Sequence, residues 1–90
     1  MKLLIIDNTN VHEAELMEKC KEEVEEIVCA MLNGDDEHTI AECFDLMQIA
    51  FSLMLKISKY DMDLLQKINN QHLEKLRGRN HKILGGITLI

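Results

Sequence analysis

Apolar residues recur at steps of three and four through the first third of the chain, which is the spacing of one face of a helix. The residues of this stripe are Met17, Cys20, Val24, Ile27, Val28 and Met31. Asn10 followed three residues later by Glu13 is typical of a capping box, and Asn33 with Gly34 is a typical helix stop. We therefore predict an amphipathic helix over residues 11–32, with the stripe facing the core.

A second helix is predicted over residues 36–58, with Asp35, Asp36 or Thr39 as its N-cap. From Cys43 onward nearly every side chain is apolar, and the polar exceptions lie on one narrow line, at Asp45, Gln48, Ser52 and Lys56. A helix that is apolar on most of its circumference must be covered on most sides, which a three-helix monomer hardly achieves. We therefore expect this helix to lie at a subunit interface in a homodimer or homotetramer.

A third helix is predicted over residues 61–77, because Asp61 or Asp63 can serve as its N-cap and Gly78 as its stop. Apolar residues again recur at helical spacing within this range. The expected inner side is formed by Leu65, Ile68, His72 and Leu76.

Length and composition narrow the fold further. Ninety residues leave room for a single domain, residues 1–90, and the absence of proline with an aromatic content of 3% favours helices over a β-sandwich. Residues 87–90 follow two glycines and are expected to form a short strand beside Leu3 to Ile6. The predicted fold class is therefore all-α, an antiparallel helical bundle with three main helices per chain, completed by oligomerisation.

Charge is distributed unevenly along the chain. Residues 1–55 carry 13 acidic and three basic residues, a net charge of −10, while residues 56–90 carry seven basic and three acidic residues, a net charge of +4. The total of −6 argues against a nucleic acid polymer as partner, because neutralising phosphates requires a basic surface. No apolar run is long enough for a signal-peptide core or a membrane span, so we expect a cytoplasmic protein without a membrane partner.

Two acidic pairs, each with a spacing of three residues, carry the candidate chemistry. By helical angle, Glu23 falls inside the apolar sector of the first helix and Glu26 at its edge, whereas Glu22 points outward. In the second helix Glu42 lies among apolar neighbours, and Asp45 begins the polar line. On two adjacent antiparallel helices, these pairs can direct four carboxylates into one space.

Carboxylates held close together repel one another, and without a cation they would protonate or move apart. A hard, oxygen-preferring divalent ion offsets this repulsion, so we predict a Mg²⁺ site, with Mn²⁺ as the alternative ion. Lys75 and, if the third helix continues past Gly78, Arg79 lie toward its inner side and would suit the phosphates of a metal-bound nucleotide. They are equally well explained as ordinary cations near a helix C-terminus.

These residues carry a resemblance to a known family. Glu-Glu-x-x-Glu at residues 22, 23 and 26, then fifteen residues, then Glu-x-x-Asp at 42 and 45, resembles the signature of the MazG-like, all-α nucleoside triphosphate pyrophosphohydrolases. The segment from His72 to Asn80 resembles the Lys/Arg-containing segment after the third helix of small members. The likeness covers roughly residues 12–82. It implies hydrolysis of a nucleoside or deoxynucleoside triphosphate to the monophosphate and pyrophosphate, with Mg²⁺ held by carboxylates in an oligomeric helical bundle.

Carried over by position, the resemblance implies that the metal ligands are Glu23, Glu26, Glu42 and Asp45. It implies that Glu22 is an accessory acid and that Lys75 and Arg79 contact the phosphates. In the reaction that we expect, Glu22 or Glu26 orients or deprotonates the attacking water. Relatives include phosphoribosyl-ATP and dUTP or dCTP pyrophosphohydrolases, so the likeness defines the cleaved bond better than the base. The alternatives are a phosphoribosyl-ATP pyrophosphohydrolase-like enzyme and a non-catalytic helical dimerisation or nucleotide-binding module.

Overall fold

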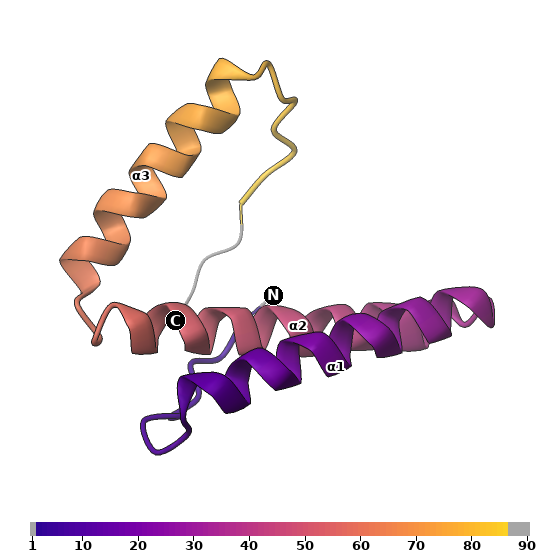
Figure 1. The fold of residues 1–90 in the computed structure, drawn as a ribbon. Helices are drawn as coiled ribbons and strands as arrows, with labels where there is room; N and C mark the ends of the chain where they lie inside the picture. Colours follow the sequence, from indigo (N-terminus) through magenta and orange to yellow (C-terminus); the bar gives the residue numbers. More distant parts are fainter. Residues whose placement is uncertain (1, 87–90) are drawn as a thin grey trace.

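The computed structural model describes residues 2–86, in which the regular elements are three helices: α1 (Glu13–Leu32), α2 (Asp36–Ile57) and α3 (Met62–Gly78). The predicted all-α fold with three helices is confirmed. Figure 1 shows α1 and α2 side by side and antiparallel, with α3 leaving the far end of α2 at an angle. The expected strand partner of Leu3 to Ile6, residues 87–90, lies outside the described residues. No described helix is both long and apolar enough to cross a membrane.

The first turn of α1 differs from the prediction. The helix begins at Glu13, and its N-cap is His12, whose Nδ1 accepts a hydrogen bond from the Ala14 backbone N–H at 3.1 Å. Asn10 is therefore not the cap, because it lies in a turn closed by the Val11 N–H donating to the Asn8 carbonyl oxygen. The capping-box interpretation of Asn10 and Glu13 was wrong.

The connection between α1 and α2 follows the sequence signals closely. Asn33 is the C-cap of α1, and Gly34 takes a positive φ of +67°, a conformation that side chains with a Cβ disfavour. Asp35 then caps α2, since its Oδ1 accepts from the His38 backbone N–H at 3.1 Å. The tight turn makes α1 and α2 an antiparallel hairpin.

The face of α1 that packs on α2 is displaced from the predicted stripe. The buried hydrophobic residues of the described chain are Leu16, Ala30 and Leu55. Of the predicted stripe only Cys20 and Ile27 are half-buried. The other four are exposed, at 46% to 64%: Met17, Val24, Val28 and Met31. The prediction failed for these four because no other described element of the chain covers that flank of α1.

The polar line on α2 holds the N-terminal segment against the helix. The Asn8 side-chain amide donates to the buried Ser52 hydroxyl at 2.8 Å, and the Gln48 amide donates to the Leu4 carbonyl oxygen. One turn after Ser52, the Lys56 ammonium donates to the Thr9 carbonyl oxygen at 2.8 Å. The last two bonds satisfy backbone carbonyl oxygens of an extended segment that lies outside the helices.

The third helix stands apart from the hairpin. After Ser58 the chain passes through two consecutive residues with positive φ, Lys59 at 54° and Tyr60 at 61°, and Asp61 then caps α3. Extensive packing between helices is confined to α1 and α2 among the described elements. The radius of gyration is 14.9 Å, against about 12 Å for a compact domain of this length. Ile68 and His72, expected on the inner side of α3, are exposed, whereas Leu65 and Leu76 are half-buried.

Replacing Gly34 by Ala is expected to lower the free energy of unfolding by about 1 kcal/mol, because an L-residue is strained at positive φ. The space around the added Cβ is open, so strain and not a clash is the cause. Urea unfolding followed by circular dichroism measures the change. Gly85→Ala, in open space and without positive φ, is the matched control, and an equal effect at both glycines would contradict this account.

Candidate metal centre

Three carboxylates converge at the middle of the α1–α2 interface. Glu23 and Glu26 lie one turn apart on α1, and Glu42 lies opposite them on the first half of α2. One oxygen from each side chain can be chosen so that all three lie within 4.8 Å of one another. The antiparallel hairpin is what brings them together, since residues three apart on one helix face the same neighbour.

Two oxygens of this cluster are buried without a hydrogen-bond donor among residues 2–86. They are Oε2 of Glu23 and Oε2 of Glu42. The Glu42 side chain is 11% exposed, and Glu23 is half-buried, while Glu26 is exposed at the rim. An ionised carboxylate oxygen that has lost water and gained no donor is costly, so the cluster requires a proton or a cation.

The pKa values show how the metal-free cluster meets this requirement. A hydrogen bond with Glu42, then burial and the charges of Glu26, Glu42 and Asp45, raise the pKa of Glu23 from 4.5 to about 7. A hydrogen bond with Glu42 and its charge also raise the pKa of Glu26. The pKa of Glu42 is lowered, chiefly by hydrogen bonds from Glu23 and Glu26. Glu42 is thus the ionised acceptor, and a proton held by its neighbours offsets the repulsion.

The donor set fits a hard divalent cation. Carboxylate oxygens are the preferred ligands of Mg²⁺ and Mn²⁺, and three of them supply enough negative charge to compete with the shared proton. The two buried oxygens without donors are the atoms that such an ion would satisfy. The cluster of Glu23, Glu26 and Glu42 can therefore hold a divalent metal ion.

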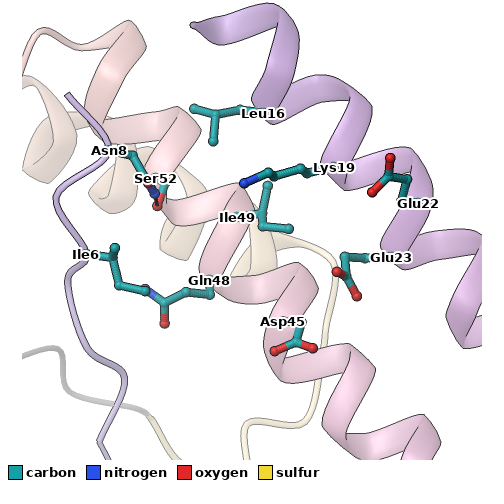
Figure 2. Close-up of a pocket in the computed structure, with 10 residues that line it drawn as sticks. All are labelled: Ile6, Asn8, Leu16, Lys19, Glu22, Glu23, Asp45, Gln48, Ile49 and Ser52. Atoms are coloured by element: carbon teal, nitrogen blue, oxygen red, sulfur yellow. Dashed lines mark hydrogen bonds between the residues drawn. The ribbon is translucent and has the colours of Figure 1, made fainter. Parts of the chain in front are cut away.

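A cleft of about 330 Å³ opens beside the cluster, between the N-terminal segment, α1 and α2 (Figure 2). Glu23 and Asp45 line it from the two helices, and Glu22 stands at its outer side on α1. Asp45 thus faces Glu23 across the cleft, although it is not one of the three clustered residues. The predicted acids are therefore brought to one place, with Glu22 and Asp45 at the cleft and the other three in the cluster.

Two further side chains border the acids, and sequence reasoning passed over both. Lys19 lines the cleft from α1, one turn before Glu23, and its ammonium extends between the helices (Figure 2). His38 lies one turn before Glu42 on α2, with its Nε2 3.0 Å from Glu42 Oε1. The available signal was their spacing of four residues from an inward-facing acid.

The structure does not bring the predicted phosphate contacts to the acids within one chain. Lys75 and Arg79 lie at the end of α3, which extends away from the α1–α2 hairpin (Figure 1). Arg79 is the C-cap of α3 rather than a residue of the helix itself. Both are exposed.

The raised pKa values of Glu23 and Glu26 predict that the metal-free protein loses stability as pH rises. Both groups bind a proton more tightly in the folded than in the unfolded state, so the free energy of unfolding falls between pH 4.5 and about 7. The lowered pKa of Glu42 acts in the opposite direction, but only below 4.5. Urea unfolding in EDTA, at fixed protein concentration, should give a smaller free energy at about pH 8 than at about pH 5.5.

Mg²⁺ should restore stability at the higher pH, where the ligands are ionised. Glu23→Gln removes the group that titrates near neutrality and should flatten the pH dependence. A free energy of unfolding that is constant across this pH window in the unsubstituted protein would contradict the shared-proton description.

Comparison with known protein families gives a match that spans the cluster. The family model described as phosphoribosyl-ATP pyrophosphohydrolase matches residues 6–72, which include all of α1 and α2 and end before Lys75. Searches of curated proteins and of solved structures give no match. The match supports the broader resemblance to the all-α nucleotide pyrophosphohydrolases and does not single out MazG. Such enzymes hydrolyse acid anhydrides and typically depend on a divalent metal, which accords with the acidic cluster. Because the match covers most of its length, the chain belongs to the phosphoribosyl-ATP pyrophosphohydrolase family.

Proposed function

We propose that this protein hydrolyses a nucleotide between its α- and β-phosphates and releases pyrophosphate, with Mg²⁺ held by Glu23, Glu26, Glu42 and Asp45. The observation that carries the proposal is the convergence of three carboxylates with two buried oxygens lacking donors, in a chain of this family. A purely structural helical hairpin has no reason to place Glu42 in its interior. Hydrophobic residues at these positions would pack the hairpin better.

When bound, the divalent ion would polarise phosphoryl oxygens and offset the charge of the polyanion. The remaining roles belong to side chains of this protein. Glu22 or Glu26, at the exposed side of the cluster, would orient or deprotonate the attacking water. Lys19 lines the same cleft as Glu22 and Glu23, and its ammonium would contact a phosphate there. No carboxylate of the described residues lies within ion-pair distance of Lys19 to compete for it.

Two substrate classes are open. The family description names phosphoribosyl-ATP, and the match over residues 6–72 favours this nucleotide as the first to be tested. The acidic motifs themselves are equally consistent with a nucleoside or deoxynucleoside triphosphate. All of these substrates carry the same triphosphate, so the metal cluster does not distinguish between them. The distinction must come from contacts to the rest of the nucleotide.

A substrate panel tests the proposal. Phosphoribosyl-ATP, the four NTPs and the four dNTPs are each incubated with the protein and Mg²⁺, and pyrophosphate and the monophosphate are measured. We expect release of pyrophosphate from at least one substrate, and its abolition by EDTA. Nucleotide binding without release of pyrophosphate would favour the non-catalytic module instead. Release of orthophosphate alone would place the cleavage at a different bond.

Glu42→Gln should lower this activity at least about 100-fold, because it removes a ligand charge while keeping the side-chain shape. Glu37→Gln makes the same substitution on an exposed residue of α2 that is not part of the cluster, and it should leave the rate unchanged. Full Mg²⁺-dependent activity in the Glu42 variant would reject the metal centre.

We also propose that the protein functions as a homo-oligomer. Its accessible surface is 7258 Å², whereas a folded monomer of 10.4 kDa exposes about 5,400 Å². The excess of about 1,900 Å² falls in the range that one subunit of an obligate oligomer buries. Large apolar side chains are exposed along both hairpin helices, among them Val24, Met31, Phe44 and Met54.

A second copy could also bring cations to the acids, since Lys75 and Arg79 at the end of α3 do not reach the acids of their own chain. Light scattering should give a molar mass of two or four times 10.4 kDa. If Lys75 and Arg79 act on the acids of the partner subunit, co-expressing Glu42→Gln with the double variant Lys75→Ala and Arg79→Ala should restore activity. In a random mixture of dimers, one site in one half of the dimers is intact, which gives about a quarter of the original rate. A monomer in solution would overturn the oligomer, and an inactive mixture would overturn the shared site.

A further inference from the structure

His38 lies at the solvent side of the carboxylate cluster and is directly bonded to it. Its Nε2 lies 3.0 Å from Glu42 Oε1, and the two residues are one turn apart on α2. The backbone at His38 is itself fixed, because its N–H donates to the capping carboxylate of Asp35. The imidazole also borders a surface cleft together with Glu26. His38 therefore joins the rigid first turn of α2 to the most buried of the three clustered acids.

The direction of this hydrogen bond follows from the acceptor. An ionised carboxylate has no proton to give, so the ring nitrogen must be the donor. Nε2 therefore carries the hydrogen, and Glu42 Oε1 accepts it. The other oxygen, Oε2, is buried, and among the described residues it has no donor other than a neighbouring acid of the cluster that carries a proton. The two oxygens of Glu42 thus have different environments, one bonded to His38 and one left for the cluster.

We propose that His38 is a positioning residue that holds the Glu42 carboxylate so that Oε2 remains directed at the cation site. The inference rests on the proposed metal centre. A Glu side chain has three rotatable bonds, and an anchor on Oε1 removes much of this freedom before the ion arrives. Partners of this kind orient metal ligands in many proteins, and their loss commonly weakens metal binding 10- to 100-fold, an order-of-magnitude range.

Core packing does not account for the placement of His38. Its side chain is 53% exposed, so it contributes little to the hairpin interior. Its other ring nitrogen, Nδ1, lies 3.8 Å from Asp35 Oδ2, which is beyond hydrogen-bond distance. The bond to Glu42 is the one hydrogen bond that the imidazole makes with the described residues.

Binding of Mn²⁺ in the absence of nucleotide tests the role directly. The dissociation constant is measured by calorimetry, and free Mn²⁺ by electron paramagnetic resonance, for the unsubstituted protein and three variants. His38→Ala removes the donor, and we expect Mn²⁺ to bind about 10-fold or more weakly. His38→Gln places an amide N–H at a similar reach and should keep the dissociation constant within about threefold of the original. His12→Asn is the matched control, a histidine beside an acid at the start of α1 and outside the cluster, and it should bind unchanged.

The outcomes separate this inference from the proposed function. Equal Mn²⁺ affinity for the unsubstituted protein and His38→Ala, with tight binding in both, would overturn the role of His38 and leave the metal centre standing. Equal weakening by Ala and Gln would show that the donated hydrogen bond is not the cause, and would also overturn it. If the unsubstituted protein binds no Mn²⁺, the metal centre and the role of His38 fail together.

Discussion

The repulsion among the carboxylates of Glu23, Glu26 and Glu42 at the α1–α2 interface is the main physical constraint on this structure. Two carboxylates about 4 Å apart repel by roughly 4 kcal/mol at an effective dielectric of 20, and burial removes the water that would weaken this repulsion. The hairpin nevertheless closes around Glu42, stabilised by the burial of Leu16, Ala30 and Leu55. In the absence of a metal ion, a proton shared with Glu23 is the remaining means of relief. The acidic interface therefore has a free energy that depends strongly on which cation is present.

The N-terminal segment explains the line of polar residues on α2. Polar residues form one line on an otherwise apolar helix, which is difficult to understand if α2 is simply surrounded by other helices. In the structure three residues of this line, Gln48, Ser52 and Lys56, form hydrogen bonds with residues 4–9. The same segment forms one wall of the cleft beside Glu23 and Asp45. The polar line thus builds part of the site, with Asp45 at the cleft and the other three residues against the N-terminal segment.

The parts of this structure that could be predicted from sequence are those that local geometry determines. The three helices follow from periodicity, from the caps Asp35 and Asp61, and from the stop at Asn33 and Gly34. The clustered acids could be identified because a charged residue inside an apolar sector is costly to bury unless a proton or a cation compensates it.

The predictions were wrong where several nearby residues could fill the same role, or where the packing partner of a residue could not be known from sequence. Asn10 and His12 can both cap a helix, and the turn at Asn8 decides between them. Val24 and Met31 look like core residues because the hydrophobic pattern predicts that they are buried. The pattern does not show which part of the chain, or which other chain, buries them. Lys19 and His38 were missed because a polar residue one turn from an acid is an ordinary feature of an exposed helix. Only the position of the second helix shows that these acids face inward.

The two residues with positive φ between α2 and α3, Lys59 and Tyr60, affect how the sequence of such a chain can change. Lys59 and Tyr60 set the direction in which α3 departs, and α3 packs little on the hairpin that carries the acids. The acidic cluster thus lies on the α1–α2 hairpin, whereas Lys75 and Arg79 lie at the end of a helix that packs little on it. Under the proposed function, substitutions in the turn or in α3 would redirect Lys75 and Arg79 toward a new ligand while the α1–α2 hairpin keeps its geometry. A protein of this design would change what it recognises without rebuilding its acidic cluster.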